Sequence, residues 1–155
     1  MNMNTPDTHQ DLSPRRERLM QAFRVEGPTL RTRNADEADP ARARIPGLWA
    51  QCLAGARPPG PLHAVYHAYE SDHHGAYSLC LGEANPRADA PGVLVPAGDY
   101  LVFEARGEMP QALIQAWAQV WRYFAAPDAP RRSYRADFER HLAPGRVELH
   151  IGVQA

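Results

Sequence analysis

Apolar residues recur with the spacing of an α-helix in two segments of the chain. In the first segment they fall at offsets 0, 3, 4, 7 and 8, at Ile45, Leu48, Trp49, Cys52 and Leu53. Pro46 suits the first turn of this helix, and Gly55 suits its C-terminal end. A second helix is expected to begin at Pro110, with an apolar stripe of Leu113, Ile114, Trp117, Val120, Trp121 and Phe124. Both patterns predict a helix with a tryptophan in the middle of its buried stripe.

Alternating apolar and polar residues predict the strands. A first strand over Met20–Arg33 should be broken at Gly27-Pro28, because proline cannot donate a hydrogen bond to a sheet. Further strands are expected at His63–Glu70, Ala76–Ala84, Asp99–Arg106, Arg132–Leu142 and Arg146–Val153. Polar, proline-rich or glycine-rich connections separate these elements at residues 34–40, 57–61, 71–75, 85–98 and 143–145, the fourth with a short apolar run, Val93–Val95.

The order of these elements is strand, helix, strand, strand, and then the same again. This order predicts an α+β fold of two duplicated strand-helix-strand-strand units, in which two helices cover an antiparallel sheet. One unit of roughly 60 residues would be marginally stable alone. Two units side by side leave a seam, where we expect a central pocket for a small molecule.

The ordered domain is expected to cover residues 19–155. Residues 1–18 are polar, contain Pro6 and Pro14, and show no stable period, so they are interpreted as a disordered tail.

Composition excludes several classes of protein. The 155 residues are 44% hydrophobic, which is enough for a core, and the net charge is −1. All 17 basic residues are arginine, and no basic excess indicates a nucleic-acid partner. No apolar run is long enough to span a membrane, and no secretory signal is recognisable. Cys52 and Cys80 are interpreted as two buried thiols of a cytoplasmic protein.

The histidines do not predict a metal site. His63 and His67 share a face of one expected strand, but their spacing places them about 13 Å apart, too far for one ion. His73 and His74 lie in the nearby turn and are interpreted as ordinary surface histidines. No cofactor-binding or catalytic motif is present, so we expect no cofactor.

Several short stretches follow one another in an order typical of one family. They are Arg31–Asn34, Ile45–Trp49, Tyr69–His73, Pro96–Glu104, Gly107–Gln111 and Asp137–Glu139. Together, over about residues 20–153, they resemble the effector-binding domain of AraC-type regulators, the GyrI-like small-molecule-binding family. The similarity is greatest to free-standing members, some of which are carried on integron cassettes. The resemblance implies the duplicated fold and its central pocket.

The resemblance also implies a function. The segment before Leu19 is too short for a helix-turn-helix module, so we expect a detached effector-binding module with no direct contact to DNA. Its expected ligand is a small, lipophilic, aromatic cation, bound without catalysis. Two alternatives stay open: hydrolysis of strained electrophilic natural products by a pocket glutamate, and a protein-interaction role toward a regulator or topoisomerase. Whether a transcription regulator reads the bound state is also open.

Two glutamates are candidates for the counter-charge of the ligand. The family pattern places an acidic residue at Glu139, and Glu104 shares a strand face with Tyr100 and Val102. The alternatives are a solvent-exposed strand position for Glu139 and an ion pair with an arginine for Glu104. The expected aromatic walls of the pocket are Trp49, Tyr66, Tyr69, Phe103 and Trp117, whereas Trp121 is assigned to the core.

Overall fold

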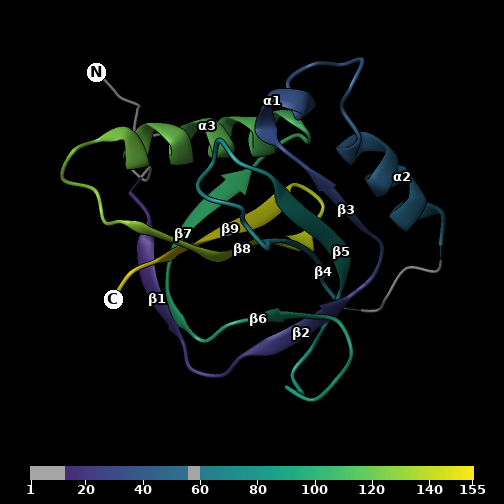
Figure 1. Cartoon of the computed structure of the whole chain (residues 1–155), viewed down its shortest axis with the longest axis horizontal. Coiled ribbons are helices and arrows are strands. Elements are labelled where there is room, and N and C mark those ends of the chain that lie inside the picture. Colours follow the sequence, from purple (N-terminus) through teal and green to yellow (C-terminus); the bar gives the residue numbers. More distant parts are fainter. Residues whose placement is uncertain (1–12, 56–59) are drawn as a thin grey trace, which may run out of the picture.

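The computed structural model describes residues 13–55 and 60–155. The described part of the chain folds into three helices and nine strands (Figure 1). In chain order the elements are β1 (Arg15–Leu19), β2 (Phe23–Glu26), β3 (Thr29–Thr32), α1 (Asn34–Glu37), α2 (Ile45–Ala54), β4 (Leu62–His67), β5 (Tyr77–Asn85), β6 (Val93–Val95), β7 (Gly98–Arg106), α3 (Gln111–Ala125), β8 (Arg132–Ala143) and β9 (Arg146–Val153). Within these described residues, no helix is both long and apolar enough to cross a membrane.

The strands form one sheet in the order β1-β7-β9-β8-β4-β5-β2-β6, and β3 also pairs with β5. In the first half of the chain β5 lies between β3 and β4, and in the second half β9 lies between β7 and β8. The two halves meet where β4 pairs antiparallel with β8. This arrangement confirms the predicted α+β class and the repeated strand-helix-strand-strand order, with the seam at β4–β8.

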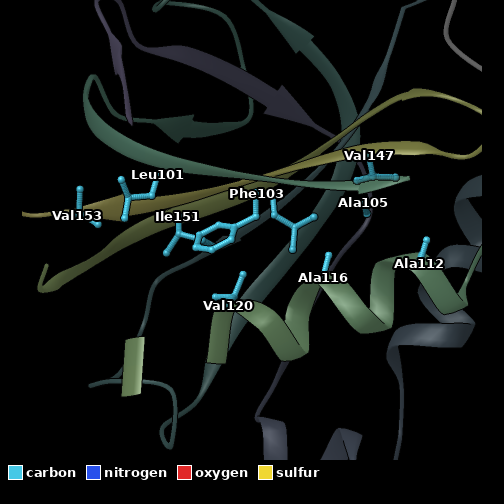
Figure 2. Close-up of a cluster of buried hydrophobic side chains, with 10 residues drawn as sticks. Leu101, Phe103, Ala105, Ala112, Ala116, Val120, Val147, Ile151 and Val153 are labelled. Carbon is cyan, nitrogen blue, oxygen red and sulfur yellow. The ribbon is translucent and has the colours of Figure 1, made fainter. Parts of the chain in front are cut away.

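The helices lie on one side of the sheet (Figure 1). Helix α3 packs on β7 and β9 through small residues one turn apart, Ala112, Ala116 and Val120. Val120 lies below Phe103 and Ile151, and Ala112 lies toward Ala105 and Val147 (Figure 2). Small side chains let a helix approach a sheet closely. Helix α2 packs through Leu48 on Ala64, Leu79 and Leu81 of β4 and β5. The opposite face is covered where β2 and β6 curl over Val65, Cys80 and Phe138.

The buried face of α3 differs from the predicted stripe. Ile114, expected in the core, is 63% exposed, and Trp121 is 38% exposed. The residues that contact the sheet most closely are the two alanines and Val120, while Leu113, Trp117 and Phe124 are partly buried beside them. A stripe of large residues therefore predicted the helix correctly but misplaced its inner face by part of a turn. In α2, Leu53 is likewise exposed.

The predicted start of the ordered domain at residue 19 is wrong by a few residues. Strand β1 pairs antiparallel with β7 and covers residues that were expected to belong to the tail. Arg15 forms ion pairs with Glu104 and Glu148, and Arg16 and Arg18 form ion pairs with Asp99. Because charged contacts and sheet hydrogen bonds hold this strand, it has no apolar period that the sequence pattern could reveal. Residues 1–12 of the expected tail, and most of the expected loop at 57–61, lie outside the described residues.

Other departures are local. The polar connection at residues 34–40 contains the short helix α1, whereas the break predicted at Gly27-Pro28 is present and separates β2 from β3. At Gly27 a Cβ atom would lie 1.7 Å from the carbonyl oxygen of Leu81, so only glycine allows the chain to lie this close to β5 between β2 and β3. Both cysteines are free; Cys80 is buried as predicted, but Cys52 is only half-buried.

Candidate functional site

An aromatic cavity of about 200 Å³ lies between α3, the β4–β5 hairpin, α1 and the first residue of α2. Half of the residues in its wall are tyrosines or tryptophans, and they are Tyr66, Tyr69, Tyr77, Trp117 and Trp121. The remaining wall residues are Asn34, Glu37, Ile45, His73 and Arg132. The rings of Tyr66 and Trp117 meet edge to face, with their centroids 5.4 Å apart. The cavity thus offers both ring faces and charged groups to a bound molecule.

Glu139 lies beneath this cavity, on the helix-covered face of the sheet. It stands opposite Ala64 of β4 and Leu149 of β9, and only 2% of its surface is exposed. Its Oε2 atom accepts hydrogen bonds from the hydroxyl of Tyr66 and from the indole N–H of Trp117, each at 2.8 Å. Its Oε1 atom lies 2.9 Å from Nε2 of His141. Two rings of the cavity wall therefore bind the same buried carboxylate.

The phenols of the cavity are strongly held in their protonated form. Burial, together with the nearby Glu139 carboxylate, raises the pKa of Tyr66 well above its ordinary value. Burial and Asp137 do the same to the pKa of Tyr69, and burial raises the pKa of Tyr77 to about 12. At neutral pH these hydroxyls are hydrogen-bond donors, so Tyr66 donates to Glu139 as the geometry requires.

A second buried acid, Asp137, differs from Glu139 in having a full counter-charge. A guanidinium nitrogen of Arg132 lies 2.7 Å from its Oδ2 atom, and both side chains are buried. Tyr69 donates to the same oxygen, and the backbone N–H of Gly152 donates to Oδ1 at 2.8 Å. Because Arg132 neutralises it, Asp137 contributes little net charge to the cavity.

Glu37 is a third acid at the cavity, and it also caps α2. Its carboxylate accepts hydrogen bonds from the backbone N–H groups of Arg44 and Ile45 and from the hydroxyl of Thr32. A carboxylate in this position satisfies the free N–H groups at a helix N-terminus. The same side chain adds negative charge to the rim of the cavity.

An irregularity in β8 shapes one end of the site. The register between β8 and β9 shifts between Arg132 and Asp137, and Tyr134 adopts a positive φ of 53°. Alternation alone would place Tyr134 on the face of Phe138. Instead its ring contacts Tyr69 at 5.5 Å, and its hydroxyl lies 3.2 Å from Nδ1 of His73. The irregularity therefore brings an additional aromatic residue to the cavity side of the sheet.

The structure gathers four of the predicted site residues and separates three. Tyr66, Tyr69 and Trp117 line the cavity, and Glu139 lies directly under two of them. Trp49 does not line the cavity and is connected to Glu139 only through His141. Its ring lies 4.9 Å from that of His141 and lines a neighbouring hollow of about 500 Å³. Phe103 is a core residue under α3, where its ring contacts those of Tyr123 and Phe124.

Glu104 lies on the other face of the sheet. Its carboxylate pairs with Arg15 and Arg106, both at 2.8 Å, which was the structural alternative considered for it. Burial alone would raise the pKa of Glu104, but the two arginines lower it below the ordinary value. A hollow of about 900 Å³ runs along β7 and α3 beside this ion pair. Since Glu104 is already neutralised there, it is a poor counter-charge for a ligand.

Sequence reasoning missed Tyr77, Trp121, Glu37 and Arg132 as cavity residues. Trp121 could have been found, because it follows Trp117 by one helical turn and shares its face. Glu37 belongs to a connection that seemed purely polar, and no local pattern distinguishes it from Asp36 or Asp39.

The comparisons with known proteins agree with this architecture. Residues 20–153 match the family model of the integron-associated effector binding proteins. An integron cassette protein from the mobile metagenome of Vibrio cholerae is 34% identical over 92% of this chain and 96% of its own, with a TM-score of 0.80.

Two more distant proteins share the fold at 18% identity. SAV2435, solved with bound tetraphenylphosphonium, has a TM-score of 0.71 over 92% of this chain and 94% of its own. A transcription regulation protein from Staphylococcus aureus Mu50 has a TM-score of 0.69 over 92% and 98%. None of the curated proteins compared with the sequence matches it. The family match and the cassette protein show that this chain belongs to the integron-associated effector binding proteins.

Proposed function

We propose that this chain binds a small, lipophilic, aromatic cation in the cavity of Tyr66, Tyr69, Tyr77, Trp117 and Trp121. The observation that carries the proposal is that Glu139 is buried without a permanent counter-charge. Among the described residues, its ion-pair partner is the imidazole of His141, which is charged only when protonated. The neighbouring acid Asp137 has a permanent partner in Arg132, and Glu139 does not.

A buried carboxylate without a permanent counter-charge favours a cationic ligand. Removing a carboxylate from water costs several kcal/mol, and neutral donors such as Tyr66 and Trp117 offset only part of that cost. A cation above those two rings would lie near the carboxylate in a region of low dielectric. Each ring face would add roughly 0.5–2 kcal/mol of cation–π attraction.

The size of the cavity indicates how such a ligand would bind. Its volume of about 200 Å³ is below the roughly 300 Å³ at which most ligand pockets begin. A flat ring system would enter between Trp117 and the tyrosines, while a bulkier cation would leave part of its surface at the mouth beside Trp121. SAV2435, which has the same fold, is bound to the bulky aromatic cation tetraphenylphosphonium, and this supports the choice of ligand class.

The alternatives have weaker support. A concave pocket with charged and aromatic walls favours a ligand over a purely protein-binding role. Hydrolysis would require a carboxylate that is free to activate water, whereas both oxygens of Glu139 already have side-chain partners. We therefore propose binding without catalysis. A partner regulator that reads the bound state stays a prediction.

The test uses two probes of nearly the same shape and opposite charge. Tetraphenylphosphonium and tetraphenylborate are titrated into the full chain by isothermal titration calorimetry. We expect the cation to bind at least tenfold more tightly than the anion, because the buried charge under the rings is negative. Equal affinity for the two probes, or tighter binding of the anion, would refute the proposed function.

A further inference from the structure

Three adjacent residues with metal-ligating side chains meet in the turn between β4 and β5. Asp72, His73 and His74 each place one ligand atom within 4.8 Å of the others. Nδ1 of His74 lies 3.3 Å from Oδ1 of Asp72, and the two imidazole rings are 4.0 Å apart. Two ligands of one tetrahedral zinc ion lie about 3.3 Å apart, given metal–ligand bonds of about 2.0–2.1 Å. The separation of Asp72 and His74 therefore already matches that of two zinc ligands, and the ligand atom of His73 lies within 4.8 Å of both.

The turn that carries these side chains is held in place by its own hydrogen bonds. The backbone N–H of His74 donates to Oδ1 of Asp72 at 2.8 Å, and the N–H of Gly75 donates to the carbonyl of Asp72. The side-chain amide of Asn34, in α1, donates to the carbonyl of His73 at 3.0 Å. Because the turn is already ordered, its backbone and side chains lose less conformational entropy when they bind a metal ion.

The environment of His73 also fixes which of its nitrogens is available. Nδ1 lies 3.2 Å from the hydroxyl of Tyr134, and the ring packs against that of Trp121 with centroids 5.2 Å apart. Metal-binding histidines generally have their second nitrogen hydrogen-bonded in this way. Tyr134 reaches His73 only because of the irregularity in β8, so residues far apart in the sequence orient this imidazole.

We propose that Asp72, His73 and His74 bind one divalent transition-metal ion at the mouth of the aromatic cavity. Two imidazoles and one carboxylate suit zinc, nickel or copper better than magnesium or calcium, which prefer oxygen ligands alone. Three protein ligands leave at least one coordination position for water or another ligand. His63 and His67 are too far apart along their strand to share one ion, whereas adjacent residues in a turn have no such separation.

A metal ion here would influence the cavity, because His73 belongs to its wall. If the proposed cation binding is correct, a charge of +2 beside the cavity opposes the entry of a cation by Coulomb repulsion. It would also offer the open coordination position to an anionic or donor group of a different ligand. The metal-loaded and metal-free forms are therefore expected to differ in ligand preference.

The site is tested by titrating zinc into the full chain and into the variant D72A/H74A, with H67A as control. His67 belongs to the same hairpin but lies outside the cluster. We expect the wild type and H67A to bind one zinc ion with the same micromolar affinity, and the double variant to bind at least tenfold more weakly. Circular dichroism establishes that the variants are folded. Absence of zinc binding in the wild type, or unchanged affinity in D72A/H74A, would overturn the proposal.

Fluorescence gives a second readout that does not depend on any organic ligand. Copper bound beside Trp121 should quench its emission, and the quenching should be lost in D72A/H74A and strongly reduced in W121F. Quenching that persists unchanged in D72A/H74A would contradict this location.

The effect on the cavity is measured separately, as the affinity for tetraphenylphosphonium with and without saturating zinc. We expect zinc to weaken it several-fold in the wild type and to leave it unchanged in H74A. Failure of tetraphenylphosphonium to bind at all would refute the proposed function, while the zinc titration would still decide the metal site.

Discussion

The indole N–H of Trp117 donates a 2.8 Å hydrogen bond to Oε2 of Glu139, which joins helix α3 to strand β8 beneath the aromatic cavity. The hydroxyl of Tyr66 donates to the same oxygen from β4, on the other side of the seam between the two halves of the sheet. Two wall residues of the cavity, one from each side of the seam, thus share one buried carboxylate as their acceptor. Substitutions of Glu139 and of Tyr66 test this relationship.

Replacing Glu139 by glutamine should weaken binding of tetraphenylphosphonium at least tenfold, or about 1.4 kcal/mol. The substitution keeps the shape of the side chain but removes the charge that attracts the cation. The matched control is Glu104→Gln, which removes a carboxylate from the opposite face of the sheet, where Arg15 and Arg106 already neutralise it. Calorimetric titration checks both variants. An unchanged dissociation constant in Glu139→Gln would remove Glu139 from the site.

Tyr66→Phe should destabilise the free protein but tighten cation binding. Loss of a hydrogen bond to a buried charge costs about 1–3 kcal/mol, measured as the free energy of unfolding in denaturant. The less well satisfied Glu139 should then attract a cation several-fold more strongly.

Tyr69→Phe is the control for this prediction. Its hydroxyl donates to Asp137, which retains Arg132 as its counter-charge, so we expect destabilisation without tighter binding. Equal gains in affinity for both variants would mean that general loosening of the cavity, and not the charge of Glu139, determines affinity.

Trp121→Ala should weaken tetraphenylphosphonium binding about fivefold, because one cation–π contact is worth roughly 1 kcal/mol. Ile114→Ala provides the comparison: Ile114 is exposed on the same helix but is not part of the cavity wall. Its removal should leave the affinity within twofold of the wild type. Thermal shifts at several ligand concentrations measure both effects. Wild-type affinity in Trp121→Ala would place the ligand deeper than the mouth.

Acid should destabilise the protein through His63, which lies on the side of the sheet away from the cavity, with its ring against Phe23. Burial, with the charge of Arg140, lowers the pKa of His63 to about 4 from its ordinary value of 6.5. Between pH 6.5 and 4 the unfolded chain binds a proton at this residue that the folded chain does not bind. Lowering the pH through this range therefore reduces the free energy of unfolding, by on the order of 3 kcal/mol in total.

His63→Gln should flatten this pH dependence, and urea denaturation at pH 7, 6, 5 and 4 measures it. Burial also lowers the pKa of His150, so part of the slope should persist in the variant. An identical slope in wild type and His63→Gln would contradict the prediction.

Much of the fold was predictable because its signals are local. The alternation over Arg146–Val153 predicted β9 with both of its ends, and the apolar stripes predicted α2 and α3 to within a residue or two. Strand β1 escaped prediction because its partners, Glu104, Glu148 and Asp99, are distant in the sequence and its stability comes from charge. The exposed position of Trp121 escaped because periodicity reveals a helix but not which part of its face meets the sheet.

Local patterns are enough to predict the repeated strand-helix-strand-strand order, the positions of the tryptophans in the two long helices and the short set of acids from which a counter-charge could come. The choice among those acids depends on the folded chain. Glu104 and Glu139 occupy similar strand patterns, but one meets arginines of β1 and β7 while the other meets Tyr66, Trp117 and His141. The chemical state of a carboxylate depends on groups that the fold brings near it, and neither strand pattern contains that information.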